Sequence, residues 1–349
     1  MMRYIIKGVV TCGLLLASLV RAEVREVPAQ YPTVQAAVDA ASSGDEIRVA
    51  AGTYEGTVKI VNKSLLLTGT DYATLQAPVG LQGALVEISG TGSVELNGFR
   101  LFGGHHGATQ QFMGLLLTGG NLVASYLVIE QFKPTDCPAC QTGHGIVVDT
   151  RASGVNATLD IRGSVITDYQ KTGILALGTR SRVFVDNVLI DGGGANPSVG
   201  KNGVALNQTA EAEVFNSPIS GNYYEGLDAA ATGVVAIQVG KLTVEGCDLD
   251  SNQVGVYLSD VASGVVDGNE ILNETRLTPQ WSLVVLDGVS TSTLQVTSNT
   301  FDHASEGVYF DGYGDGIKLI GNTLRCAPLT DDTTSQVTKR RNRSLCVNP

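Results

Sequence analysis

Polar side chains of complementary chemistry gather in the middle of the sequence, where Lys171 and Lys201 stand 30 residues apart. Eliminative cleavage of a uronic acid needs a positive group against the substrate carboxylate, a base for the C5 proton and an acid for the leaving oxygen. Lys171 or Lys201 can serve as the positive group or the base, and Tyr224 as the acid. The predicted polar cluster comprises Asp168, Lys171, Lys201, Asn202, Tyr224, Glu225 and Asp228.

The same cluster also contains a pair of carboxylates, Glu225 and Asp228. A glycoside hydrolase uses two carboxylates that flank the scissile bond. Three residues of extended strand span roughly 10 Å, which suits an inverting hydrolase better than a retaining one. Ordinary solvated turn residues are the alternative interpretation, and the residues alone do not choose between these readings.

Histidines and cysteines form a second candidate site, of the kind that binds metals. Its members are His105, His106, Cys137, Cys140 and His144. Two thiolates with imidazoles suit zinc or copper. An acidic polysaccharide could instead be bound through a divalent cation such as calcium. In an oxidising compartment Cys137 and Cys140 could instead form a disulfide, and Cys326 and Cys346 could staple the C-terminal segment.

A short recurring pattern must position these residues. It is clearest at 203–207, where a glycine is followed by apolar residues at alternating places and then by a polar residue. The pattern recurs with its glycine at Gly114, Gly145, Gly173, Gly226, Gly255 and Gly307, and without glycine at Ser282. A repeat of this length indicates a solenoid, because each unit buries its apolar face only against its neighbours.

Alternation within the repeat separates an inner face from an outer one. The residues one and three places after the glycine, such as Ile146, Val204 and Leu258, are apolar and are expected to face the core. The residue two places after it then faces outward, and this column is also largely apolar. It runs Leu116, Val147, Leu175, Ala205, Asp228, Tyr257, Val284, Tyr309. A long ligand groove, with Tyr257 and Tyr309 binding substrate beside Asp168 and Asn202, is one interpretation; a face covered by loops is the other.

A second pattern lies between these strands, in which a small or Asn residue follows an apolar residue by three places, as at Val266 and Asn269. Asn187, Asn269, Asn299 and Asn322 are expected to form a column of bonded turn amides. With these motifs the chain resembles the right-handed parallel β-helix proteins of the pectin lyase-like superfamily over roughly residues 31–326. The resemblance implies an all-β, single-stranded right-handed parallel β-helix with polysaccharide sites on its outer face, in mid-solenoid.

The two ends of the chain differ from the repeat. Residues 1–22 have the charge and apolar run of a secretory signal peptide, which predicts a secreted or periplasmic protein. A short amphipathic helix at 33–41 would cap the solenoid of residues 23–326. Residues 327–349 lose the repeat and are expected to form a C-terminal tail.

The net charge of −11 argues against a nucleic-acid surface. The sequence therefore predicts an exported protein, without a transmembrane segment, that binds an extended, acidic polysaccharide. Cleavage of that polymer by a lyase or a glycoside hydrolase stays open. So do a non-enzymatic envelope or surface binding protein and a periplasmic, copper-type metal accessory protein.

Overall fold

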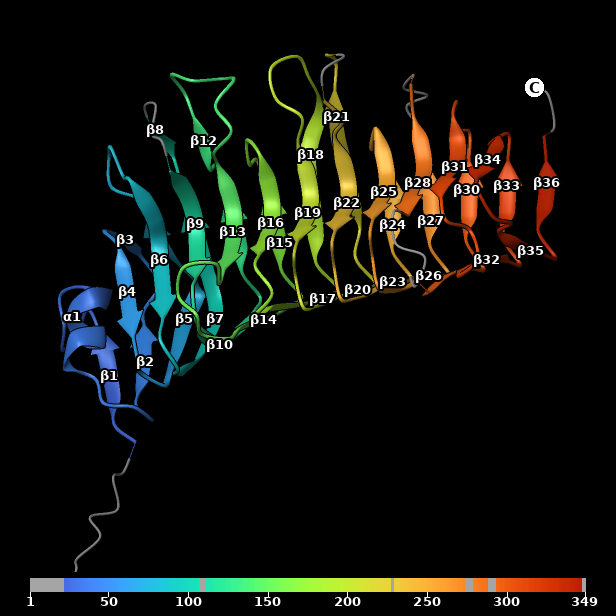
Figure 1. The fold of residues 1–349 in the computed structure, drawn as a ribbon. Coiled ribbons are helices and arrows are strands. Elements are labelled where there is room, and N and C mark those ends of the chain that lie inside the picture. Colours follow the sequence, from blue (N-terminus) through green and yellow to red (C-terminus); the bar gives the residue numbers. More distant parts are fainter. Residues whose placement is uncertain (1–21, 107–110, 227–228, 274–278, 288–292, 347–349) are drawn as a thin grey trace, which may run out of the picture.

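Short parallel strands stack side by side along a solenoid that runs from the N-terminal end to the C-terminal end (Figure 1). The computed structural model describes residues 22–106, 111–226, 229–273, 279–287 and 293–346. The expected signal peptide, apart from residue 22, lies outside these described residues. No helix in the described part of the chain is long and apolar enough to cross a membrane.

One side of the solenoid is a sheet of 11 strands, here called the first sheet. Its strands, in chain order, are β4 (Val58–Val61), β6 (Gly83–Ser89), β9 (Phe112–Leu117), β13 (His144–Asp149), β16 (Thr172–Leu177), β19 (Asn202–Asn207), β22 (Thr232–Ile237), β25 (Val254–Ser259), β28 (Trp281–Asp287), β31 (Gly307–Gly312) and β34 (Leu329–Thr333). Each strand is one turn of the solenoid beyond the strand before it.

An 18-stranded sheet and a five-stranded sheet form the remaining sides. The 18-stranded sheet contains β1 (Val24–Val27), β2 (Glu46–Val49), β3 (Thr53–Glu55), β5 (Leu65–Gln76), β7 (Ser93–Phe102), β10 (Gly120–Ser125), β11 (Val128–Glu130), β14 (Ala157–Arg162), β15 (Val165–Thr167), β17 (Ser181–Asp186), β18 (Leu189–Asn196), β20 (Glu211–Phe215), β21 (Ile219–Tyr224), β23 (Lys241–Glu245), β26 (Ser263–Asp267), β29 (Thr293–Thr297), β32 (Ile317–Ile320) and β35 (Thr338–Arg340). The five-stranded sheet contains β24 (Asp248–Asp250), β27 (Glu270–Leu272), β30 (Thr300–Asp302), β33 (Thr323–Arg325) and β36 (Arg343–Leu345). A separate short pair joins β8 (His105–His106) to β12 (Lys133–Pro134).

The core is a set of aliphatic columns along the axis. Ile146 pairs in register with Ile174, and Ile174 with Val204, on neighbouring strands of the first sheet. Ile146 and Val204 have no exposed surface and Leu258 is 1% exposed, so the predicted inward positions are confirmed. Alternate residues of each strand point the same way, which places every second apolar residue in this interior.

The recurring glycine is required by how closely successive turns approach. A Cβ atom built at Gly145 would lie 2.6 Å from the carbonyl oxygen of Gly173. At Gly203 it would lie 2.4 Å from Ile219 and 2.6 Å from the carbonyl oxygen of Gly233. A side chain at these positions would therefore push adjacent turns apart.

One predicted repeat unit was wrong. The strand that follows β19 in the first sheet is β22, which begins at Thr232, so Gly233, rather than Gly226, continues the glycine column. Ala229, expected inside, is exposed. The alternation of residue types within 226–230 is similar to that of a strand, but the strand of this turn is β22. The segments that begin at Gly226 and Gly233 both fit the sequence pattern. Only the pairing with β19 shows that the second one is the strand.

The predicted amide column exists in the later turns. Asn299 donates from Nδ2 to the Oδ1 of Asn322 at 2.9 Å and accepts from Nδ2 of Asn269 at 2.9 Å. Asn322 continues the column to Asn342 at 3.1 Å. Asn187 is not a member: it lies at a left-handed turn position with φ 54°, and the neighbouring Val188 amide bonds instead to the Ser217 hydroxyl.

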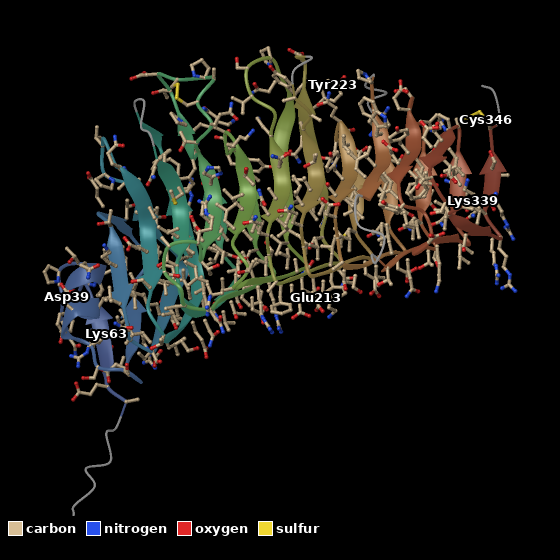
Figure 2. All side chains as sticks on the ribbon, viewed as in Figure 1. Asp39, Lys63, Glu213, Tyr223, Lys339 and Cys346 are labelled. Carbon is tan, nitrogen blue, oxygen red and sulfur yellow. A yellow bond between two sulfur atoms is a disulfide. The ribbon has the colours of Figure 1, made fainter. Side chains whose placement is uncertain are left out.

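Both ends of the solenoid are closed by specific contacts. Helix α1 (Val34–Ala40) is capped by Thr33, whose hydroxyl accepts from the Ala36 amide at 3.1 Å. Lys63 donates to the carbonyls of Val38 and Asp39 at the other end of α1 (Figure 2). At the C-terminal end, residues expected to form a tail outside the repeat instead add strands β34, β35 and β36 to the three sheets, and Cys326 and Cys346 are joined in a disulfide.

Asn299→Ala is expected to destabilise the protein by about 2–3 kcal/mol, because it leaves buried amide and carbonyl groups of the column without partners. Asn97→Ala, at an exposed position on β7, is the matched control and should change stability by less than about 0.5 kcal/mol. Urea unfolding followed by circular dichroism measures both variants. Equal midpoints for the two would show that the column does not contribute to stability.

Candidate functional site

The loops that lead into the first sheet project along one edge of the solenoid, here called the loop edge. They include residues 135–143, between β12 and β13, and residues 197–201, between β18 and β19, which rise above the strands in Figure 1. Tyr223 lies on this edge, whereas Glu213 lies on the opposite side (Figure 2). Irregular loops are tolerated here because the turns of the core are already paired on both sides.

A cavity of about 410 Å³ opens between these two loops. This lysine cavity is lined by Lys133, Pro134, Thr135, Pro138, Gln170, Asn196, Pro197, Ser198 and Lys201. It draws together residues from three successive turns, and its volume lies in the range usual for small-molecule sites.

Lys201 is the most perturbed group of the lysine cavity. Its side chain is only 4% exposed, and its ammonium nitrogen donates to the carbonyl of Gly192. Its pKa is lowered to about 8: burial is the largest cause, the nearby positive charge of Lys133 acts in the same direction, and the carboxylate of Asp191 opposes both effects. A lysine with this pKa is partly neutral near pH 8, so it can accept a proton.

Lys133 is a site residue that the sequence analysis missed. Its ammonium forms an ion pair with Asp168, at a turn position with φ 53° on the following turn of the solenoid. Burial lowers the pKa of Lys133, and the charge of Asp191 partly offsets this. The structure thus brings the predicted residues Asp168 and Lys201 into one neighbourhood with Lys133. In the sequence, Lys133 is marked only by being a lysine one turn of the solenoid before Lys171.

Lys171 lies near the lysine cavity but is bonded to the loop rather than lining the cavity. Its ammonium nitrogen donates to the carbonyl of Gly200 at 2.7 Å, which ties strand β16 to the 197–201 loop. Burial lowers its pKa. Lys171 does not line the lysine cavity, so its position favours a role in holding the loop that carries Lys201.

The histidine and cysteine residues are not arranged as a metal site. Cys137 and Cys140 form a disulfide, so neither offers a thiolate, and the side chains of His105 and His106 lie outside the described residues. Within the described part, no group of three or more His, Cys, Asp or Glu side chains is close enough to hold a metal ion. The predicted zinc or copper ligand set is corrected accordingly.

Gln170, another residue that the sequence analysis missed, fastens the disulfide loop. Its side-chain amide donates to the carbonyls of both Cys137 and Cys140 at 2.8 Å. Gln170 and Pro138 both line the lysine cavity. The loop that was expected to bind a metal therefore forms one wall of that cavity.

The remaining members of the predicted polar cluster are spread over neighbouring turns. Asn202 accepts a hydrogen bond from the Thr232 hydroxyl at 2.8 Å, because Thr232, rather than Glu225, is its neighbour in the column. Tyr224 pairs in register with Asn196 of the lysine cavity. Glu225 is exposed and Asp228 lies outside the described residues. The predicted pair of Glu225 and Asp228 therefore stays a prediction.

Tyr257 and Tyr309 lie on the outer face of the first sheet, on either side of Val284. Both are partly buried, and burial raises the pKa of Tyr257. They belong to β25 and β31. Lys201 directly precedes β19, and β22 separates β19 from β25 in the first sheet. The two tyrosines therefore do not line the lysine cavity.

A larger hollow, of about 540 Å³, lies on the outer face of the first sheet over β9, β13 and β16. This outer groove is lined by Gln111, Met113, Leu116, Thr118, Gln141, Thr142, His144, Val147, Asp149, Arg151, Ala152, Ser153, Leu175 and Leu177. Burial lowers the pKa of His144 to about 4, and the charge of Lys171 acts in the same direction. His144 is therefore neutral at neutral pH.

Comparison with known proteins places this architecture in a family. The family model described as "Right handed beta helix region" matches residues 144–324, which is more than half of the chain. This chain belongs to the right-handed β-helix family. The predicted fold, a right-handed parallel β-helix, is thereby confirmed. No curated protein matches the sequence.

Solved structures of other right-handed β-helices resemble this one in fold. Full-length tailspike protein 2 from Escherichia coli O157:H7 bacteriophage CAB120 superposes with a TM-score of 0.63 at 13% identity, over 88% of this chain and 43% of that one. The enzymatically active domain of bacteriophage CBA120 tailspike protein 2 gives 0.62 at 13%, over 93% and 52%. The Dettilon tailspike protein gives 0.51 at 14%, over 89% and 68%. This β-helix thus spans about half the length of the first two.

In this β-helix, Lys201 should make stability depend on pH. Its folded pKa lies below its unfolded value, so the unfolded state binds more protons between about pH 8 and pH 10.5, and stability rises across that window. Lys201→Met should abolish this rise, which amounts to about 2–3 kcal/mol between pH 7 and pH 10. Urea unfolding of wild type and variant at intervals from pH 7 to pH 10 measures it.

Lys318→Met, at an exposed lysine on β32, is the matched control and should leave the pH profile of wild type in place. A profile for Lys201→Met that runs parallel to wild type would show that Lys201 keeps its ordinary pKa.

Proposed function

We propose that this protein is exported and that it binds an extended, acidic polysaccharide along the loop edge, cleaving it by β-elimination with Lys201 as the base. One observation carries the proposal: a buried lysine with a pKa of about 8 stands beside a second lysine in a cavity of a protein whose net charge is −11. Two lysines and no carboxylate are among the described residues that line the cavity, which favours an anionic ligand at this place.

The arrangement can carry each step of the elimination. Lys133 is about one-third exposed, at 34%, and would exchange its ion pair with Asp168 for one with a uronate carboxylate, which acidifies the C5 proton. Neutral Lys201 can donate to the Gly192 carbonyl while its lone pair takes that proton. The C5–H electron pair then forms the C4–C5 double bond as the C4–O bond breaks. Tyr224, on the strand paired with β18, is assigned the protonation of the leaving oxygen.

Export is supported by two independent features. The first is the charged and then apolar N-terminal segment of residues 1–22. The second is the presence of two disulfides, Cys137–Cys140 and Cys326–Cys346, because such bonds persist in oxidising compartments. Together they favour a secreted or periplasmic location.

Elimination is favoured over the other functions that the sequence left open. Hydrolysis needs two carboxylates about the bond, and no carboxylate is among the described residues that line the lysine cavity. A copper-type accessory role needs ligands, and Cys137 and Cys140 are bonded to each other. A non-enzymatic binding protein would use the same lysine cavity without the proton transfer, so experiment separates it from the lyase.

A panel of polyuronates should yield unsaturated uronyl ends, detected by their ultraviolet absorbance, with a rate that rises as pH approaches and passes 8. Lys201→Met should reduce the rate at least about 100-fold while binding is retained, since a general base contributes that much or more. Lys133→Met should weaken binding. Lys318→Met, an exposed lysine away from the cavity, is the control and should behave as wild type.

Each other result contradicts a definite part of the proposal. New reducing ends without unsaturated ends would indicate a hydrolase. Binding without either product would indicate a binding protein. The absence of binding to every acidic polymer, or full activity in Lys201→Met, would overturn the assignment of the lysine cavity.

A further inference from the structure

The outer groove is separate from the lysine cavity, yet the two share a wall. Gln141 and Thr142 line the outer groove, and Pro138, in the same disulfide loop, lines the lysine cavity. The carbonyl of Gly143 accepts from the amides of Gln170 and Lys171 at 3.0 and 2.9 Å, so this wall is held to the next turn of the core. A polymer lying along the loop edge would pass both hollows.

The floor of the outer groove is aliphatic. Leu116, Val147 and Leu175 stack in register on β9, β13 and β16, and all three point outward. Among the described lining residues there is no Phe, Tyr or Trp on which a sugar ring could stack. Such a floor favours a small alkyl group, because it gains by burying a methyl rather than a hydroxylated face.

One end of the groove carries a neutral hydrogen-bonding group. The Nδ1 atom of His144 is buried and has no partner among the described residues. A buried N–H without an acceptor is rarer than an unfilled acceptor, which favours the tautomer with the proton on Nε2. In this tautomer Nε2 carries an N–H donor, and the ring of His144, which lines the groove, bears no charge at neutral pH.

The other end of the groove adds no free charge. Arg151 donates to both carboxylate oxygens of Asp149, at 3.0 and 2.7 Å, so the two charges balance each other. A ligand of this groove therefore needs a neutral acceptor for His144 and a methyl group for the aliphatic floor, close together on one substituent.

We infer that the outer groove is a subsite for an acetyl group carried by a sugar residue of the polysaccharide. The acetyl carbonyl accepts from His144, and the methyl group packs on Leu116, Val147 and Leu175. This inference extends the proposed function, since it names a substituent of the substrate, but it rests on different residues. The two can therefore fail separately.

Calorimetric titration with four polymers tests the assignment: O-acetylated polygalacturonate, its de-acetylated form, acetylated xylan and de-acetylated xylan. De-acetylation is expected to weaken binding about 10-fold on either backbone in the wild-type protein. Leu175→Asn should remove that preference. Val235→Asn, in the same outward column two strands along the sheet, is the matched control and should keep it.

His144 is tested by a pair of variants. His144→Phe keeps the ring but removes the donor, so it should lose most of the preference for the acetylated polymers. His144→Gln restores an N–H donor and should recover part of it. A preference for acetylated polymers that persists in His144→Phe, with an unchanged unfolding midpoint, would show that the N–H of His144 does not bind the acetyl carbonyl.

Equal affinity for acetylated and de-acetylated polymers overturns the acetyl subsite, even where the acidic backbone still binds more tightly than xylan and so supports the lysine cavity. A preference for acetyl groups without a preference for the acidic backbone supports the subsite and contradicts the proposed substrate charge. Failure of all four polymers to bind overturns both. A change of molecular mass in Leu175→Asn, measured by light scattering, would make the groove a contact between copies of the chain. Displacement of the polymer by a long-chain alkyl glycoside would make it a lipid site. Either result would overturn the inference.

Discussion

The structure depends on the register between successive turns. Each turn hydrogen-bonds to the next through parallel strands, and this is possible only where the two backbones approach closely and present the same side chains to the interior. The glycine column meets the first condition, since a Cβ at Gly145 would lie 2.6 Å from the Gly173 carbonyl oxygen. The aliphatic columns and the Asn269–Asn299–Asn322 amides meet the second. Neither condition can be met by one turn alone, so the core forms only as a stack.

A core of this kind leaves the loop edge free to vary. Because the strands already satisfy the backbone of every turn, loops can lengthen without disturbing the interior. The disulfide loop and the 197–201 loop do so on nearby turns, and the lysine cavity lies between them. The burial that lowers the pKa of Lys201 thus comes from these loops. The position of Lys201 at the end of its loop is fixed by strand β19, which begins at the next residue.

Errors in the sequence-based prediction fall where several turns must be compared. Gly226 and Gly233 each begin a plausible strand, and only pairing with β19 selects Gly233. Asn187 and Asn269 occupy similar local motifs, but the turn at Asn187 is one residue out of step with the column. Lys133 and Gln170 were missed because their role comes from contacts with loops 30 or more residues away, which no local pattern records.

The solenoid, its inward aliphatic positions and the later amide column can be predicted from the sequence, because they follow from a repeat that is visible along one chain. The sequence also marked Asp168 and Lys201 as members of one polar cluster. The tertiary structure decided which lysine is buried, which cysteines are bonded rather than free, and which outward residues line a groove. The reason is physical: desolvation, disulfide formation and cavity shape depend on distances between side chains of different turns, and these distances exist only once the turns are stacked.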